Sequence, residues 1–188
     1  MKKDQADVQI FIRKIPGNTR KMHAGRALVR ELLQMQEEPM SKTPDGKPYF
    51  TNHPEISFSI SDCGEYVAVA LSKKNQIVGI DLEAVRTVSE RMISRFFSEG
   101  EQRGCKHLSD VERQKAFIEV WTRKEAFSKY LGCGLRGDLR KLDTTEGFET
   151  GKIRTYWIRG NDGEEMALSV ALDEPFLIDW KGEDYGLI

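Results

Sequence analysis

Apolar and polar residues alternate in several short stretches of the chain, which is the pattern of β-strands. Residues 8–12 form the first of these stretches. Over 56–61, isoleucine and phenylalanine alternate with serine, which indicates a strand with one buried face. Residues 66–71 and 77–83 predict two more strands. The turns between these last three strands favour an antiparallel meander in the middle of the chain.

Apolar residues three and four positions apart predict helices in three regions. These regions run from an N-cap at Asn18 to Gln36, from Val88 to Phe97, and from Val111 to Tyr130. Ser98 and Glu101 have the spacing of a capping box, in which each side chain bonds to the other residue's backbone N–H. Gly132 is a natural residue to end the longest helix.

The last third of the chain returns to the strand pattern over 153–158, 166–172 and 176–180. Residues 39–48 contain several helix and strand breakers and predict a loop. Helices that alternate with antiparallel strands in this way are typical of the α+β class, with the helices packed against the sheet.

The composition is that of an ordinary globular protein. The chain has 188 residues with 29 Lys and Arg against 30 Asp and Glu, so we expect one average domain or two small ones and no wholesale binding of nucleic acid. No apolar run approaches the ~20 residues that span a membrane, and the polar N-terminus lacks the apolar stretch of a signal peptide. Three scattered cysteines (Cys63, Cys105 and Cys133) indicate reduced thiols and a cytoplasmic protein.

Two carboxylates stand at the end of the apolar strand over 77–83. Asp81 and Glu83 are two residues apart, so they lie on one face of that strand. Paired acids repel each other unless a cation lies between them, and oxygen ligands with room for water and phosphate suit Mg²⁺. Taken alone, the segment also fits an exposed strand end that is simply acidic.

A second pair of charges lies on the long helix. Glu125 and Lys129 are four residues apart and share a helical face within an aromatic-rich stretch. A carboxylate that completes a metal site, one turn from a cation that can meet a phosphate, suits pyrophosphate chemistry. A common surface ion pair has the same spacing.

These segments resemble the signatures of the 4′-phosphopantetheinyl transferase family. Gly-Ile-Asp-Leu-Glu at 79–83 is similar to the family's Gly-x-Asp-x-Glu, and residues 121–135 are similar to Trp-x-x-Lys-Glu-Ala/Ser-x-x-Lys followed by Gly-x-Gly-Leu. Residues 95–101 resemble its Phe-Phe-Ser-x-x-Glu element, 45–49 its Gly-Lys-Pro loop and 58–64 its Phe-Asn-x-Ser-His-Ser-Gly strand end. The resemblance covers residues 43 to about 135, roughly half of the chain.

The resemblance implies an architecture as well as a reaction. The length is closer to the longer, surfactin-synthetase-activating type than to the short holo-acyl-carrier-protein synthases. That type has two similar halves in one chain, each an antiparallel sheet packed with a long helix. It therefore implies a pseudo-two-fold monomer with an N-terminal half over 1–74, a C-terminal half over 75–188 that carries the metal-site motifs, and an active site between them.

The family's reaction transfers phosphopantetheine from coenzyme A to a serine of an acyl or peptidyl carrier protein and releases 3′,5′-ADP. By resemblance, Asp81, Glu83 and Glu125 hold Mg²⁺ on the coenzyme A pyrophosphate. Glu125 is the first choice for the general base and Glu83 the second. Lys129 stabilises or protonates the leaving phosphate, and Lys47 contacts a phosphate of coenzyme A.

Further candidates for coenzyme A binding come from the strand end and the first helix. The family has a His after the strand-end serine, Ser61, whereas this chain has Asp62, which would weaken the binding of a phosphate. Arg26 and Arg30 share a helical face and could meet the 3′-phosphate, although such residues more often form a solvated face.

Two other functions are consistent with parts of the sequence. One is a non-catalytic module, derived from the same fold, that binds a carrier protein or coenzyme A, with Asp62 as a mark of lost activity. The other is a different Mg²⁺-dependent phosphotransferase. It is disfavoured because the chain has neither a Gly-x-x-x-x-Gly-Lys-Ser/Thr loop nor a kinase signature.

Overall fold

The structure, a computed structural model, describes residues 7–15, 21–72, 76–133, 139–144, 152–173 and 177–188. Its elements are β1 (Val8–Lys14), α1 (Lys21–Leu33), β2 (Met40–Lys42), β3 (Pro48–Phe50), β4 (Phe58–Cys63), β5 (Tyr66–Ser72), β6 (Gly79–Ala84), α2 (Glu90–Phe96), α3 (Glu99–Cys105), α4 (Asp110–Leu131), the 3₁₀ helix η2 (Leu139–Lys141), β7 (Ile153–Gly160), β8 (Glu165–Ala171), β9 (Ile178–Lys181) and β10 (Tyr185–Leu187).

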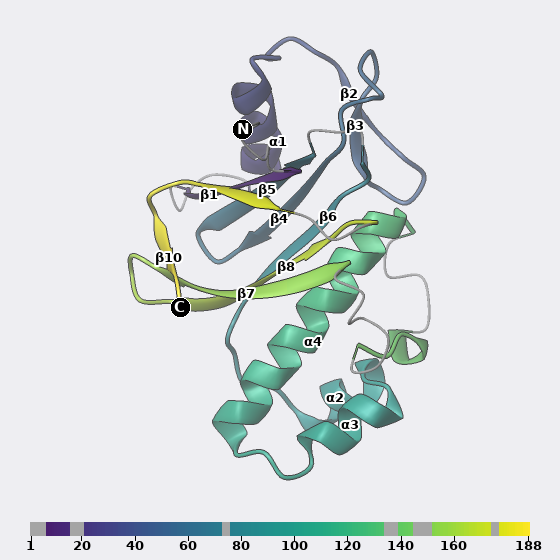
Figure 1. Ribbon diagram of the computed structural model, residues 1–188, viewed down its shortest axis with the longest axis vertical. Coiled ribbons are helices and arrows are strands. Elements are labelled where there is room, and N and C mark those ends of the chain that lie inside the picture. Colours follow the sequence, from purple (N-terminus) through teal and green to yellow (C-terminus); the bar gives the residue numbers. More distant parts are fainter. Residues whose placement is uncertain (1–6, 16–20, 73–75, 134–138, 145–151, 174–176) are drawn as a thin grey trace, which may run out of the picture.

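Two sheets lie between helices, with α1 beyond one sheet and α4 against the other (Figure 1). The first sheet has the strand order β4-β5-β1-β9 and the second the order β10-β7-β8-β6. In each half, the strand before the long helix pairs antiparallel with the second strand of a later hairpin: β1 with β5 of the β4–β5 pair, and β6 with β8 of the β7–β8 pair. The predicted α+β class with two similar halves is therefore confirmed.

The last two strands of the chain are divided between the two sheets. β9 pairs in parallel with β1 and so adds a C-terminal strand to the first sheet, whereas β10 pairs antiparallel with β7 in the second. The parallel pair is a departure from the fully antiparallel sheets that the sequence pattern favoured. The division of the chain at residues 74 and 75 stays a prediction.

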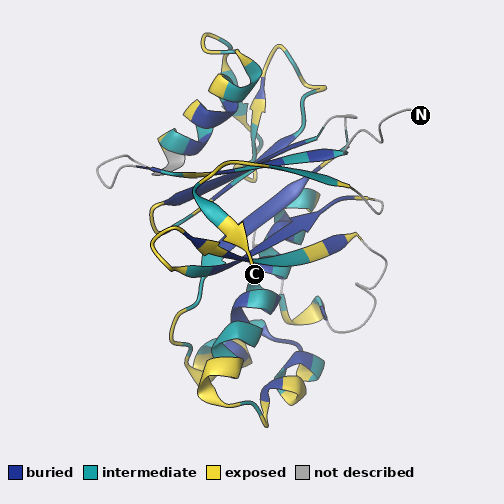
Figure 2. Cartoon of the chain, turned by 60° about the vertical axis from the view of Figure 1, so that its left-hand side comes forward, coloured by how far each residue is buried: buried dark blue, intermediate teal, exposed yellow. Residues whose placement is uncertain are grey.

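The main hydrophobic core fills the space between the two sheets. Alternation along the strands turns Ile10 and Ala68 of the first sheet toward Ile80 and Leu168 of the second, and all four side chains are fully buried. In Figure 2 the buried residues are concentrated in the sheets, while exposed residues mark the outer surfaces of the helices. A smaller cluster under α1 covers the other face of the first sheet.

The expected meander is wrong at its third strand. β4 and β5 form the antiparallel hairpin, but β6 pairs with β8 in the other sheet. β6 is still linked to β4, because alternate β4 side chains accept hydrogen bonds from its backbone. Ser59 Oγ accepts from Ile80 N at 3.1 Å, Ser61 Oγ from Leu82 N at 3.2 Å and Cys63 Sγ from Ala84 N at 3.0 Å.

The serine face of β4 is accordingly buried, whereas the sequence pattern indicated a strand with one buried face. Ser59 and Ser61 are 4% and 6% exposed. The predicted loop over 39–48 also contains structure, since β2 and β3 form a short antiparallel pair. Alternation is difficult to recognise in strands of three residues, which explains why this pair was missed.

The helix boundaries follow the predicted signals closely. Ser98 and Glu101 form the expected capping box, and Gly132 ends α4 in the left-handed conformation, with φ of 69°. A second capping box that the sequence analysis missed, Ser109 with Glu112, starts α4. The predicted N-cap at Asn18 lies outside the described residues.

Two expectations from composition can be compared with the structure. None of the three cysteines forms a disulfide, as the scattered spacing indicated. Among the described residues, no helix combines the length and the apolar character needed to cross a membrane.

Close packing at Gly79 explains why the Gly-x-Asp-x-Glu motif begins with glycine. A Cβ built on Gly79 would overlap the carbonyl oxygen of Ala126 and the backbone nitrogen of Tyr130, both in α4. These are backbone atoms of a helix, so they cannot move aside as a flexible side chain would. Glycine at this position lets α4 lie directly against β6.

We therefore predict that Gly79→Ala destabilises the protein by at least ~2 kcal/mol, because the added methyl group forces β6 and α4 apart. Urea unfolding measures the effect. Gly186→Ala on β10 is the matched control, since a Cβ there meets nothing within 4 Å. Equal stability of the two variants would contradict the close contact.

Candidate active site

The end of β6 brings two carboxylates to the contact with α4. Asp81 and Glu83 lie on the same face of β6 as Gly79, the face against which α4 packs. Asp81 is only 4% exposed, and Glu83 is partly buried. The interpretation as a simply exposed acidic strand end is therefore wrong.

Lys129 of α4 reaches the same carboxylate. Its Nζ atom lies 2.7 Å from Asp81 Oδ1 and 3.0 Å from Ser61 Oγ. Ser61 Oγ in turn donates to Asp81 Oδ1 at 2.8 Å, within the protein interior. Residues from β4, β6 and α4 therefore meet at one carboxylate oxygen, and Lys129 has a buried acid as its partner.

Glu125 lies one turn before Lys129 in α4, and its pKa is raised. Burial, and then the negative charge of Asp81, raise its pKa from 4.5 to about 7; Lys129 opposes this shift, and Glu83 adds to it. The pKa of Glu83 is also raised, first by burial and then by Asp81. The three carboxylates thus act on one another electrostatically across the β6–α4 contact.

The donor chemistry of this group fits a hard divalent cation. Asp81 Oδ2 is buried and has no hydrogen-bond partner among the described residues, so one carboxylate oxygen is available as a ligand. Acids with raised pKa values gain from a nearby positive charge. The side chains do not converge on a single point, however: in the described part of the chain, no three His, Cys, Asp or Glu residues are placed to hold a metal ion.

A cavity of about 270 Å³ opens beside Glu125 and Lys129, between the two halves. It is lined by Asp45, Gly46, Lys47, Pro48, Ser59, Ile60, Glu125, Ser128, Lys129 and Gly132. The Lys47 ammonium group donates to Val78 O at 3.2 Å and to Lys129 O at 3.0 Å. Burial lowers the pKa of Lys47 to about 8. Lys47 thus ties the loop before β3 to α4 and to the residue that precedes β6.

The remaining predicted binding residues lie farther from the carboxylates. Asp62 is exposed, and strand alternation places it on the face of β4 opposite Ser61. Arg26 and Arg30 belong to α1, which covers the outer face of the first sheet, whereas α4 packs against the second sheet (Figure 1). Arg30 donates to Glu38 O at 3.2 Å through Nη2. The structure does not bring these three residues together with Asp81.

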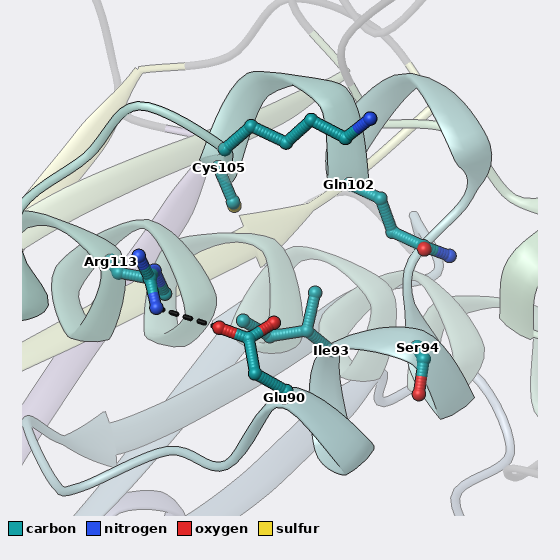
Figure 3. Close-up of a pocket in the computed structure, with 7 residues that line it drawn as sticks. Glu90, Ile93, Ser94, Gln102, Cys105 and Arg113 are labelled. Atoms are coloured by element: carbon teal, nitrogen blue, oxygen red, sulfur yellow. Dashed lines mark hydrogen bonds and ion pairs between the residues drawn. The ribbon is translucent and has the colours of Figure 1, made fainter.

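A second cavity, of about 220 Å³, lies among α2, α3 and the start of α4. Figure 3 shows that Glu90 and Arg113 point toward each other at this cavity, and their ion pair measures 2.6 Å. None of the site residues predicted from the sequence lines it. Glu90 and Arg113 at its edge are paired with each other, whereas the cavity between the halves contacts Glu125 and Lys129.

Comparison with known protein families agrees with this geometry. Residues 77–181, from the strand that carries Asp81 to β9, match the model of the 4′-phosphopantetheinyl transferase superfamily. The chain belongs to this superfamily. The family predicted from the sequence motifs is therefore confirmed.

Individual relatives of this superfamily are similar over part of their length. A 4′-phosphopantetheinyl transferase of Bacillus subtilis is 29% identical over 71% of this chain and 62% of its own length. The transferase gsp of Aneurinibacillus migulanus is 32% identical over 82% and 60%, and the transferase Sfp of Bacillus subtilis strain 168 is 32% identical over 59% and 51%. The chain thus matches between about half and two thirds of the length of these relatives. The similarity to Sfp agrees with the longer type that was predicted from the sequence.

A solved structure was also found. The holo-[acyl-carrier-protein] synthase (AcpS) of Thermotoga maritima is 27% identical, with a TM-score of 0.36, and the match covers 52% of this chain and 62% of that one.

Sequence reasoning missed two residues that hold the superfamily's acidic motif in place. Trp121 Nε1 donates to Glu83 Oε1 at 3.2 Å. Its signal was present, because Trp121, Glu125 and Lys129 follow one another at intervals of four and so share a helical face. Ser59 was read as part of a solvent-facing row, although it bonds to the backbone of β6.

The raised pKa of Glu125 predicts how the metal-free protein responds to pH. The folded state binds this proton more tightly than the unfolded chain, so the stabilising contribution is complete below about pH 4.5 and is lost as the pH rises through about 7. At pH 8, Glu125→Gln should therefore stabilise the protein by ~1–3 kcal/mol, since glutamine carries no charge.

Denaturant unfolding in a chelating buffer between pH 5 and pH 8 measures this effect. Stability should depend less on pH in Glu125→Gln than in the unmodified protein. Asp110→Asn is the control, because the Asp110 side chain is 91% exposed at the start of the same helix. Parallel curves for all three proteins would contradict the assigned pKa.

Proposed function

We propose that this chain transfers the 4′-phosphopantetheine group from coenzyme A to a serine of an acyl or peptidyl carrier protein. Membership of the superfamily and the names of the relatives support this reaction. The observation that carries the proposal is the 2.7 Å contact between Lys129 Nζ and Asp81 Oδ1, which joins the two motifs across 48 residues. Glu125 and Lys129 line the cavity between the halves, and Lys129 connects that cavity to the buried Asp81.

Asp81, Glu83 and Glu125 would together hold Mg²⁺. The buried, unpartnered Oδ2 atom of Asp81 and the raised pKa values of the two glutamates support this assignment. When bound, the ion would neutralise negative charge on the pyrophosphate of coenzyme A as the phosphorus–oxygen bond breaks.

Glu125 is the proposed general base, and Glu83 is the second choice. A carboxylate with a pKa near 7 both binds and releases a proton readily at neutral pH. Glu125 takes the proton of the carrier serine, and the serine oxygen forms a bond to the β-phosphorus. The bond from that phosphorus to the bridging oxygen breaks, and 3′,5′-ADP leaves with the electron pair.

Lys129 stabilises the leaving phosphate or donates a proton to it. The Lys129 side chain is 30% exposed and lines the cavity, so it is accessible to an anion there, whereas its partner Asp81 is buried. For the binding of coenzyme A we propose Lys47 and Ser61 at the junction and, farther from the carboxylates, Asp62 on β4 and Arg26 and Arg30 on α1. Lys47 and Ser61 lie closest to the carboxylates in the hydrogen-bond network.

The proposal extends to the setting of the reaction. We propose a monomer in the cytoplasm, with coenzyme A and a carrier protein as its partners and neither nucleic acid nor a membrane among them. The site between two halves of one chain supports the monomer, and three cysteines that form no disulfide suit a reducing compartment.

Mass spectrometry of an apo carrier protein, incubated with this protein, Mg²⁺ and coenzyme A, tests the reaction. We expect a gain of one phosphopantetheine per carrier. Asp81→Ala and Glu125→Gln should each lower turnover by at least ~100-fold, the scale of losing a preorganised charge-stabilising group. Asp110→Asn should keep its activity. Turnover near that of the unmodified protein in either variant, at saturating Mg²⁺, would remove Asp81 or Glu125 from the mechanism.

Lys129→Ala separates the catalytic role from a structural one. A surface ion pair would contribute only ~0.5 kcal/mol of stability and nothing to the rate. The proposed role instead predicts a single-turnover rate at least ~10-fold lower, because positive charge is lost beside the leaving phosphate. Single-turnover kinetics and thermal unfolding are measured on the same samples. A change confined to unfolding would count against the role of Lys129.

A further inference from the structure

A buried ion pair lies on the other side of α4 from the carboxylates. The Lys124 ammonium group is 2.6 Å from Glu101 Oε2, and both side chains are completely buried. Lys124 directly precedes Glu125 in the sequence, and Glu101 belongs to the capping box of α3. The proposed reaction assigns no role to either residue.

The Lys124 ammonium group is bound to three separate segments. Besides Glu101, it donates to Phe96 O at the end of α2, at 2.9 Å, and to Leu139 O in η2, at 2.8 Å. An ammonium group has three protons, so these three acceptors can use all of them. The position of this side chain is therefore fixed from α2, α3 and η2 together.

Glu101 is held just as firmly. Its Oε2 atom accepts from Ser98 N at 2.8 Å, and its Oε1 atom accepts from both the backbone nitrogen and Oγ1 of Thr144, each at 2.8 Å. The carboxylate thus joins the first turn of α3 to the chain that follows η2. Because its partners are mostly backbone groups, the anchor for Lys124 does not depend on mobile side chains.

Helix geometry connects this anchor to the active site. Successive residues of a helix are rotated by about 100°, so a fixed Lys124 also fixes the directions of its neighbours. Trp121, Glu125 and Lys129 form a stripe on the side that faces β6, where Trp121 bonds to Glu83 and Lys129 to Asp81. A small rotation of α4 would displace all three side chains.

We propose that the Lys124–Glu101 pair is a positioning device that sets the rotation of α4 and so holds Trp121, Glu125 and Lys129 against β6. Its effect on turnover rests on the proposed function, whereas its effect on geometry does not. A buried ion pair can often be replaced by uncharged groups with little loss of stability, so a role in positioning can be tested separately from a role in folding.

The test uses the double variant Lys124→Met with Glu101→Gln. Replacing both partners avoids an uncompensated buried charge, which would prevent the single variants from folding properly. The control is Val29→Ala, a fully buried side chain of α1 in the separate cluster under the first sheet. All measurements are made well below the unfolding temperature of both variants.

The first measurement is the indole N–H resonance of Trp121 in ¹H–¹⁵N spectra, assigned with Trp121→Phe. Adding Glu83→Gln to the unmodified protein or to Val29→Ala should shift this resonance, because the indole donates to the Glu83 carboxylate. In the double variant, we expect Glu83→Gln to leave the resonance unchanged. A shift as large as in the control would overturn the proposal and would indicate that contacts such as Thr122 with Ser169 set the rotation of α4.

The second measurement is turnover with an apo carrier protein at saturating coenzyme A. The double variant should lose at least ~10-fold in kcat, because displaced catalytic groups react slowly, while the KM for coenzyme A changes by less than about twofold. Turnover equal to that of Val29→Ala would contradict a positioning role. If the unmodified protein transfers nothing, the proposed function fails, and the indole measurement still decides the positioning.

Discussion

The edge of β6 is closed by side chains instead of by another strand, and both the joint between the halves and the active site depend on this. Ser59, Ser61 and Cys63 of β4 accept hydrogen bonds from alternate backbone nitrogens of β6. Ser61 has one donor and two acceptor positions, and it uses them on Asp81, the backbone of Leu82 and Lys129. The same hydroxyl group that joins the two sheets therefore also orients the buried acid. Displacement of β4 from β6 would alter the site even if every residue of the acidic motif remained in place.

The face of β6 that meets α4 is determined by close packing. Gly79 has no side chain, so the backbone of α4 at Ala126 and Tyr130 comes directly against the strand. This approach keeps water away from the carboxylates that follow, and burial is the largest cause of the raised pKa values of Glu83 and Glu125. The glycine and the acids of the first motif thus contribute to a single effect: the glycine brings the helix close, and the nearby helix makes the acids difficult to ionise.

Periodicity predicted α1, α2, α4 and the longer strands, whereas α3 was indicated only by its capping box. Spacing placed the motif acids on shared faces, and their roles came from the resemblance to the family. Periodicity could not predict which strands pair, because alternation is the same whether β6 continues the β4–β5 hairpin or joins β8, more than 80 residues further along the chain. It also assigned the serines of β4 to a solvent-facing side, since a hydroxyl that bonds to a neighbouring backbone looks the same in the sequence as one that bonds to water. Lys124 is a similar case, because it sits in a charged stretch of the helix and yet is completely buried.

The polar residues of α4 are buried on two sides of the helix. On one side, Lys124 is neutralised by Glu101 within a network of backbone partners. On the other side, Glu125 faces Asp81 and Glu83, and among these acids Lys129 supplies the opposing positive charge. Burying a charge is costly unless the charge is paired, so the balance of charge on each side of the helix matters. The first is electrostatically satisfied and holds the helix, whereas the second keeps an excess of negative charge. The fold itself therefore maintains the attraction for a cation at the junction of the two halves.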